Sequence, residues 1–261
     1  MKNYVKPKKS LGQHFLTDLN VASRIADTVD VCPDIPILEV GPGTGVLTQF
    51  LLPKGRAFKA VELDEESVAY LTQHGLLADD QIIAEDFLKT DLHLVFRNSP
   101  FVLTGNYPYN ISSQIFFKVV DNKDIIPCCT GMIQREVAQR LAAKPGGKDY
   151  GVLTIFIQMW YDIQYLFTVD ENVFNPPPKV KSGVVCLLRN QRRAMPCDEK
   201  LFRRIVKTVF TMRRKMVRNG LKQIHPLCTT LDSELLQKRP EQLSIDDFID
   251  LTNQISALLH A

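Results

Sequence analysis

An apolar run that ends directly in a glycine-rich loop constrains the fold of this chain most. The run Ile37–Val40 leads into the loop 41–45, and a helical pattern begins at Val46. Glycine lets the backbone approach a ligand closely, and the start of the following helix favours negative charge. The pattern predicts a strand, a ligand-binding turn and a helix, with glycines at alternate positions, Gly41, Gly43 and Gly45.

Strand-like and helical patterns alternate along the first part of the chain. After Ile37–Val40, further strands are predicted to begin at Phe58, Ile82 and Phe101, and 129–133 reads as a buried strand. This alternation is typical of an α/β fold with a mainly parallel sheet and helices on both faces. The helical patterns around these strands are residues 21–29, 46–52, 111–120 and 136–143. Residues 151–160 are ambiguous by periodicity, and we favour a helix there.

The end of the chain has a different pattern. Residues 161–169 and 180–188 read as a closing antiparallel pair of strands, and Pro196-Cys197 marks a boundary. Only helical patterns follow, the last at 245–259. We therefore expect a catalytic domain over residues 1–194 and a small all-α domain over residues 195–261.

The spacing of the glycines favours S-adenosylmethionine over a dinucleotide. A dinucleotide fold uses G-x-G-x-x-G with pyrophosphate on the helix end. Here the third glycine comes one residue early, and Val46 stands where that pattern wants glycine. Glu39, two residues before the loop, is suited to steer a cation. S-adenosylmethionine has an ammonium, a carboxylate and a sulfonium but no phosphate.

Two further carboxylates end predicted strands. Glu62 follows the strand that begins at Phe58, where nucleotide-binding sheets place an acid on the ribose hydroxyls. Asp86 ends the strand that begins at Ile82 and is suited to accept a hydrogen bond from the cofactor's adenine. Each residue by itself is more often a solvated carboxylate. Together with Glu39 and Asn106 they fall on one edge of a parallel sheet, where ligands bind.

The tetrapeptide Asn106-Tyr107-Pro108-Tyr109 follows the strand at Phe101 and is suited to hold a planar amine. The Asn106 side-chain oxygen and the Tyr107 carbonyl can accept the two hydrogens of an adenine N6 and favour a tetrahedral nitrogen. Pro108 pushes Tyr107 towards an extended backbone, and Tyr109 can stack on the base. The alternative is a plain proline turn between strand and helix.

Four segments together resemble the signature of the rRNA adenine N6-dimethyltransferases: residues 9–16, 39–45, 106–112 and 174–182. Residues 213–222 and 239–244 resemble the KsgA branch of that family. The resemblance implies a class I, Rossmann-like, S-adenosylmethionine-dependent fold. It also implies methylation of two adjacent adenosines near the 3′ end of 16S rRNA to N6,N6-dimethyladenosine, within an immature 30S particle and coupled to small-subunit biogenesis.

The resemblance also assigns roles to single residues. It implies cofactor contacts from His14 and Leu16, and it places Phe174 across the target base from Tyr109, so that the two rings sandwich the adenine. His14 stands where many relatives carry Asn, which leaves open whether its side chain or its backbone touches the cofactor. Tyr107 stands where Leu or Ile is usual and is expected to contribute mainly its carbonyl.

Positive charge is concentrated between Arg189 and Lys222, a segment that contains twelve Lys and Arg but only two acidic residues. The segment therefore has a net charge of +10, and because the whole chain has +3, the rest of the chain has −7. A charge run is often a solvated helix face. Beside an acidic remainder it favours salt-dependent contacts with RNA phosphates, and the candidate residues are Arg203, Arg204, Lys207, Arg213, Arg214, Lys215, Arg218 and Lys222.

Other classes of protein fit the sequence less well. The basic N-terminus (Lys2, Lys6, Lys8 and Lys9) precedes no apolar segment of the kind that a secretory signal needs, and no apolar run is long enough to span a membrane. Six cysteines without C-x-x-C spacing predict reduced thiols and no zinc site. We expect a cytoplasmic monomer without a metal ion.

Three alternatives remain at this point. An Erm-type methylase of large-subunit rRNA shares the catalytic motifs, and only the two segments typical of the KsgA branch argue against it. A non-catalytic RNA-binding assembly factor of the same fold is disfavoured by the intact glycines, acids and Asn106. A nicotinamide dehydrogenase is disfavoured by Val46.

Overall fold

The computed structural model describes residues 5–260, so Lys2 lies outside the described residues. By their contacts, the described residues form two compact units. The first runs to Gln139 and continues with Tyr161–Arg189, and the second comprises Arg140–Trp160 and the chain from Asn190 onward. The second unit thus begins close to the expected boundary at 194/195 but also takes an earlier segment. The division into domains 1–194 and 195–261 stays a prediction.

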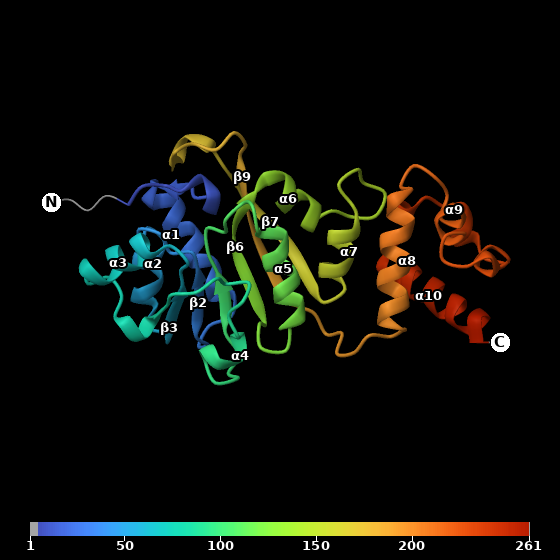
Figure 1. Cartoon of the computed structure of the whole chain (residues 1–261), viewed down its shortest axis with the longest axis horizontal. Helices are drawn as coiled ribbons and strands as arrows, with labels where there is room; N and C mark the ends of the chain where they lie inside the picture. The colour runs from blue at the N-terminus through green and yellow to red at the C-terminus, as the bar shows by residue number, and fades with distance from the viewer. Residues whose placement is uncertain (1–4, 261) are drawn as a thin grey trace. The chain divides into compact units, whose positions relative to one another are not determined.

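A seven-stranded sheet forms the centre of the first unit (Figure 1), in the order β4-β3-β2-β5-β6-β9-β7. The five strands from β4 to β6 are parallel, and β9 is antiparallel to both β6 and β7. The predicted parallel sheet and its closing antiparallel pair are therefore confirmed. The strands are β2 (Ile37–Val40), β3 (Phe58–Val61), β4 (Ile82–Ile83), β5 (Val102–Thr104), β6 (Cys128–Gln134), β7 (Tyr161–Val169) and β9 (Ser182–Arg189).

The third parallel strand is shorter than the sequence predicts. β4 stops at Ile83, and Asp86 lies in the turn beyond it. The Asp86 carbonyl accepts hydrogen bonds from the N–H groups of Lys89 and Thr90. The Glu85 N–H donates to the Ile83 carbonyl at 3.0 Å, so the chain already turns directly after β4 and Asp86 lies beyond the strand.

Helices pack against both faces of the sheet. α1 (Leu19–Asp27) is capped by Asp18 and contributes Ile25 to a buried cluster with Ile37 and Val102 of the sheet. On the opposite face, Phe116 of α5 (Ser112–Asp121) packs edge-on against Tyr107. The other helices assigned wholly or partly to this unit are α2 (Thr48–Leu51), α3 (Glu65–Gln73), α4 (Leu92–Val95) and α6 (Arg135–Leu141).

The strand order changes direction at β2, which lies between β3 and β5. From β2 the chain proceeds to β3 and β4 on one side and later to β5 and β6 on the other. In open α/β sheets, the crevice at the carboxyl ends of the strands at such a point is where ligands bind. The glycine loop follows β2 and the Asn106 tetrapeptide follows β5, so both lie at this point.

A second, two-stranded sheet joins the N-terminal segment to the proline loop. β1 (Phe15–Leu16) pairs antiparallel with β8 (Phe174–Asn175). The N–H and the hydroxyl of Thr17 both donate to the Val173 carbonyl. Residues more than 150 positions apart are thereby held together next to the sheet edge.

In the second unit the described residues are helical, as predicted. The helices are α7 (Val152–Gln158), α8 (Glu199–Thr211), α9 (Val217–Leu221) and α10 (Ile245–His260), with short 3₁₀ turns between them. The Asp198 carboxylate caps α8 by accepting from the Leu201 N–H. Val209 on its buried face lies so close to α9 that a Cβ on Gly220 would be 2.8 Å from the Val209 Cα.

Candidate active site

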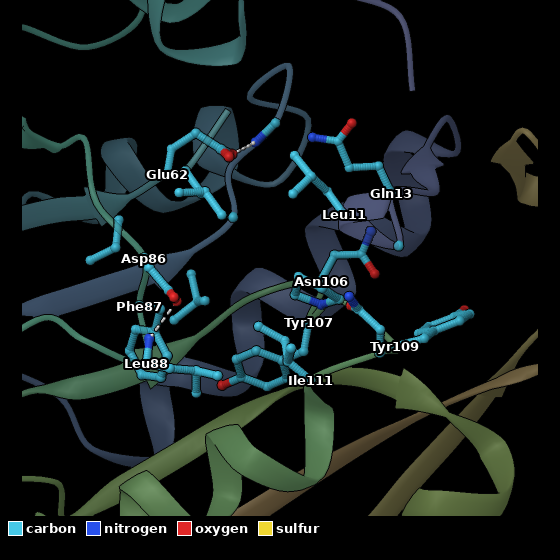
Figure 2. A pocket seen from close by; sticks show the side chains of 18 of the residues that line it. Leu11, Gln13, Glu62, Asp86, Phe87, Leu88, Asn106, Tyr107, Tyr109 and Ile111 are labelled. Carbon is cyan, nitrogen blue, oxygen red and sulfur yellow. Dashed lines mark hydrogen bonds between the residues drawn. The ribbon is translucent and has the colours of Figure 1, made fainter. Parts of the chain in front are cut away.

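A cavity of about 300 Å³ opens at the carboxyl ends of the parallel strands. Residues that follow β2, β3, β4 and β5 line it, together with the N-terminal segment Ser10–Phe15. Figure 2 shows Glu62, Asp86 and Asn106 around this space. The described residues that line it include three carboxylates (Glu62, Glu85 and Asp86) and no Lys or Arg. Such a lining suits a ligand with positive charge and without phosphate.

Glu62 ties the glycine loop to the end of β3. One carboxylate oxygen accepts from the Gly43 N–H at 3.0 Å and the other from the Asp64 N–H at 2.9 Å. Burial raises the pKa of Glu62, and the two backbone hydrogen bonds oppose that rise. Each oxygen has a second lone pair for a ligand hydroxyl. Gly43 has φ +57°, and a Cβ on it would lie 2.8 Å from the Phe15 ring, so this position needs glycine.

Glu39 does not line the cavity, although a residue that steers a cationic ligand would have to lie there. Its side chain is 1% exposed, lies outside the cavity lining and accepts a hydrogen bond from the Thr48 hydroxyl at 2.7 Å. Burial raises the pKa of Glu39 to about 8, against the Thr48 hydrogen bond that lowers it and with a further rise from Glu62. The expectation for Glu39 is therefore corrected: it joins β2 to α2 from behind the glycine loop.

Asp86 lines the cavity from the turn after β4. Its Oδ1 accepts from the Leu88 N–H at 2.9 Å, as Figure 2 shows. The side chain keeps 30% of its surface exposed. The second oxygen, Oδ2, lies 3.9 Å from the Nζ of the exposed Lys89 side chain.

The position of Asn106 depends on a close approach of two strands. The Met132 N–H donates to the Gly105 carbonyl and the Tyr107 N–H to the Met132 carbonyl, both at 3.0 Å. Gly131 makes this approach possible, because a Cβ there would collide with the Gly105 carbonyl. The Asn106 amide nitrogen donates to the His14 carbonyl at 3.0 Å, which leaves the amide oxygen as the acceptor. Gly131 was missed, although a glycine inside a buried strand is a recognised sign of such an approach.

The two tyrosines of the tetrapeptide have different environments. Tyr107 is 1% exposed, and its hydroxyl donates to the Thr130 carbonyl at 2.8 Å, so its side chain belongs to the core. Tyr109 and Pro108 are half-buried and line the cavity. The Tyr109 hydroxyl is hydrogen-bonded to Ser182, and burial raises the pKa of that phenol.

His14 makes one contact with its ring and another with its backbone. Its Nδ1–H donates to the Pro176 carbonyl at 2.8 Å, and its own carbonyl accepts from Asn106. Its ring lies 5.4 Å from the Tyr109 ring, tilted by 31°. His14 lines the cavity with its Nδ1 already occupied, so this nitrogen serves the protein framework.

Besides Glu39, three predicted site residues do not line the cavity. Leu16 and Phe174 are each 4% exposed and belong to the core cluster, and Gly45 packs against Leu76. The predicted sandwich of a base between Phe174 and Tyr109 needs both rings at the cavity, and in the described structure Tyr109 lines it whereas Phe174 does not. The physical reason is the pairing of β8 with β1, which turns Phe174 inward and its neighbour Asn175 outward.

A network around Asp64 was also missed. Lys8 and Gln13 both donate to its carboxylate, Gln13 at 3.1 Å, and thereby hold the N-terminal wall of the cavity. Burial alone would raise the pKa of Asp64, but hydrogen bonds from Lys8, Gln13 and Ser67 outweigh it and lower the pKa. The sequence has no signal that links Lys8 to a residue 56 positions away.

Three of the predicted RNA-binding residues have internal partners. Arg203 bridges to Glu199 within α8, Arg213 donates to the Gly147 carbonyl at 2.9 Å, and Arg204 donates to the Ile224 carbonyl at 3.5 Å. Arg203 and Arg213 are half-buried. The other six are exposed: Arg204, Lys207, Arg214, Lys215, Arg218 and Lys222. The apolar face of α8 is buried: Phe202 is 2% exposed and Phe210 packs against Phe248.

In the part of the chain that the structure describes, no group of three or more His, Cys, Asp or Glu is arranged to hold a metal ion. The six cysteines are free thiols. None of the described helices combines the length and the apolar character that a membrane span requires.

The parallel sheet, its switch point and a cavity whose described lining has carboxylates but no Lys or Arg are those of a Rossmann-like methyltransferase fold. Two solved structures share it. A dimethyladenosine transferase from Plasmodium falciparum has a TM-score of 0.76 at 24% identity, over 94% of this chain and 98% of that chain, and shows the fold. The 23S rRNA methyltransferase ErmE has a TM-score of 0.64 at 26% identity, over 91% and 99% of the two chains.

Sequence comparison defines the family. A family model described as ribosomal RNA adenine dimethylase matches residues 4–256. The ribosomal RNA small subunit methyltransferase A of Bacteroides thetaiotaomicron is 62% identical over 98% of this chain and 96% of its own. The corresponding protein of Porphyromonas gingivalis is 56% identical over 95% and 97% of the two chains. The chain belongs to the ribosomal RNA adenine dimethylase family.

Proposed function

We propose that this protein transfers methyl groups from S-adenosylmethionine to N6 of two adjacent adenosines near the 3′ end of 16S rRNA, giving N6,N6-dimethyladenosines. The observation that carries the proposal is Asn106, which presents its amide oxygen at a cavity lined by carboxylates. The small-subunit relatives at 62% and 56% identity favour this substrate over the large-subunit rRNA of the Erm type.

The cavity suits the methyl donor. S-adenosylmethionine supplies a methyl group on a positively charged sulfur, which an amine can attack. Glu62 holds the glycine loop and presents free lone pairs at the position for ribose hydroxyls, and Asp86 presents an oxygen for the adenine amino group. Gly43, where a Cβ would strike Phe15, allows this ring to pack against the glycine loop in the wall of the cavity. Pyrophosphate would meet three carboxylates without a basic partner among the described lining residues.

Asn106 and Tyr107 polarise the target amine. The lone pair of an adenine N6 is delocalised into the ring, and acceptance of its hydrogens by the Asn106 oxygen and the Tyr107 carbonyl favours the tetrahedral nitrogen. The His14 carbonyl holds the Asn106 nitrogen, so the oxygen is already oriented before the base arrives. Oriented acceptors of this kind act mainly in the transition state. The attacking nitrogen becomes acidic as it loses its lone pair, and its proton leaves to water.

The second methylation uses the same pocket. A monomethylated amine has one N–H, so only one of the two acceptors can be satisfied. Tyr109 then holds the base by stacking, a contribution of roughly 1–3 kcal/mol per base. The pocket therefore readmits the methylated adenine through contacts that do not depend on both N6 hydrogens.

The exposed basic residues of the second unit dock the enzyme on rRNA. Lys and Arg neutralise phosphates and release counterions, which makes binding steeply salt-dependent. The substrate is the RNA within an immature 30S particle, and the protein acts as a monomer in the cytoplasm. The candidates are five exposed residues: Lys207, Arg214, Lys215, Arg218 and Lys222.

The test combines genetics with single-turnover kinetics. Mass spectrometry of 16S rRNA from a deletion strain should show the two dimethyladenosines lost, and restored by the parent gene but not by Asn106→Ala. In vitro, Asn106→Ala should reduce the single-turnover rate far more than RNA affinity. Exposed Asn172 provides a control, since Asn172→Ala should leave both unchanged. Unaltered 16S rRNA in the deletion strain would refute the proposed substrate.

A further inference from the structure

We propose that Ser182 is a positioning residue of this methyltransferase, and that its hydroxyl fixes the ring of Tyr109 for stacking on the target adenine. The proposal rests on the function proposed above. It follows from a hydrogen bond between residues 73 positions apart, from the rigidity of the strand that carries Ser182, and from a second link between the same strand's loop and Asn106.

The first observation is the hydrogen bond itself. The Tyr109 hydroxyl and the Ser182 hydroxyl lie 2.5 Å apart. Figure 2 shows Tyr109 beside Asn106 and across the pocket from Asp86. Stacking requires only an aromatic ring, and phenylalanine would provide one. The hydroxyl of Tyr109 therefore serves another purpose: because its partner is fixed, the bond selects one orientation of the ring.

The second observation is that Ser182 cannot move easily. It is 0% exposed and begins β9, where it pairs with Gln134 of β6 on one side and Val169 of β7 on the other. The next residue, Gly183, is closely surrounded, since a Cβ there would lie 2.8 Å from Ala138. A buried hydroxyl needs a hydrogen-bond partner, and a strand paired on both sides holds that hydroxyl in place. Tyr109, by contrast, lies in a turn between β5 and α5.

The third observation is that the loop before β9 also supports Asn106. The Pro176 carbonyl accepts from the His14 Nδ1–H, and the His14 carbonyl accepts from the Asn106 amide nitrogen. The segment 174–182 thus contacts both ends of the tetrapeptide: one through His14 and the other through Ser182. It thereby fixes the distance between the acceptor for N6 and the ring that holds the base.

This gives the segment 174–182 a role that differs from the predicted one. Phe174 itself is buried and away from the cavity. The segment orients Asn106 through His14 and orients Tyr109 through the Ser182 hydroxyl. Loss of a hydrogen bond worth about 0.5–1.5 kcal/mol corresponds to a decrease of about 2- to 13-fold in the population of the selected ring orientation.

The experiment is a double-mutant cycle with Ser182→Ala, Tyr109→Phe and the two combined. Each single variant removes one hydroxyl from the same bond and keeps the ring, so each should lower the single-turnover methylation rate on small-subunit particles by about 2- to 13-fold. The double variant should be no slower than either single variant, because the bond can be lost only once. Tyr109→Ala, which removes the ring, should be slower than all three.

Two further readouts separate positioning from a general structural effect. Binding of S-adenosylmethionine by calorimetry should stay within about twofold of the parent, because the proposed cofactor contacts do not include the Tyr109 ring. Affinity for the RNA particle should fall less than the rate, because most of it comes from the basic residues that contact phosphates. Tyr165→Phe is the matched control: its hydroxyl bonds to Thr168 at 2.7 Å on β7 of the same sheet, outside the cavity lining. It should methylate at the parent rate.

The outcomes distinguish this proposal from the proposed function. If the parent protein methylates no small-subunit RNA, the proposed function fails. If the parent methylates normally and Ser182→Ala and Tyr109→Phe match it, or if their losses multiply in the double variant, Ser182 does not position Tyr109. Equal losses in cofactor binding and rate would also overturn the proposal, since they indicate a structural defect.

Discussion

Replacement of Glu39 by glutamine should make the stability of this protein depend less on pH. Glu39 is 1% exposed and accepts a hydrogen bond from the Thr48 hydroxyl. Glutamine has nearly the same shape, and its amide oxygen can accept the same hydrogen bond. The substitution therefore removes a titratable group and leaves packing and hydrogen bonding in place.

The expected magnitude follows from the raised pKa. In the folded chain the pKa of Glu39 is about 8, and its ordinary value is 4.5. Between these values the unfolded chain has released the proton while the folded chain keeps it, so the unfolding free energy of the parent falls by about 1.36 kcal/mol per pH unit. The loss begins near pH 4.5 and ends near pH 8, and over that interval it amounts to about 5 kcal/mol.

Urea unfolding of Glu39→Gln and the parent, from about pH 5 to about pH 9, measures this difference. The advantage of the variant should be small at the acidic end and grow to several kcal/mol at the alkaline end. Glu65→Gln, which removes an exposed carboxylate near the same sheet edge, should show no such growth. If the unfolding free energies of Glu39→Gln and the parent differ by the same amount at every pH, the reasoning is refuted. Glu39 would then have the same pKa in the folded and the unfolded chain.

Three other predictions concern the cavity and the basic surface. Gly43→Ala should weaken binding of S-adenosylmethionine at least about tenfold in calorimetry, because the new Cβ would lie 2.8 Å from the Phe15 ring. Gly55 has a similar φ of +68° but open space around it, so Gly55→Ala should bind the cofactor normally. Equal cofactor affinities of the two variants would contradict the predicted clash. Asp64→Asn should raise the KM for S-adenosylmethionine with little change in kcat, because this carboxylate holds the N-terminal wall of the cavity, and steady-state kinetics would contradict the idea if kcat alone fell. Replacing Arg214 and Lys215 together by Ala should reduce the slope of log affinity for the RNA particle against log salt by about 2; an unchanged slope would show that these side chains are merely solvated.

Local sequence patterns were sufficient for the sheet and for much of the cavity. The alternation of apolar strands and helices predicted a parallel sheet, and the carboxyl ends of its strands necessarily meet at one edge. The residues that follow those strands, Gly43, Glu62, Asp86 and Asn106, do line one cavity. Strand period, glycine spacing and proline restriction act within a few residues, so the order of residues along the chain carries this information.

Other features depend on pairings between distant segments. Glu39 and Glu62 are both strand-end acids in the sequence, but Glu39 lies within β2 and is bonded to Thr48 in the interior, while Glu62 follows β3 and faces the cavity. Nothing in the local pattern separates them. The difference arises because α2 covers Glu39, whereas Glu62 lies at the cavity.

The same holds for Phe174 and Ser182. The sequence marks the phenylalanine and the prolines after it, but β8 pairs with β1 and turns Phe174 into the core, and the two pairings of β9 bring Ser182 to Tyr109. Which side of a strand faces a site depends on register, and a shift of one residue reverses it. The residue types around the cavity could thus be read from the sequence, whereas their orientation was decided by contacts among segments far apart in the chain.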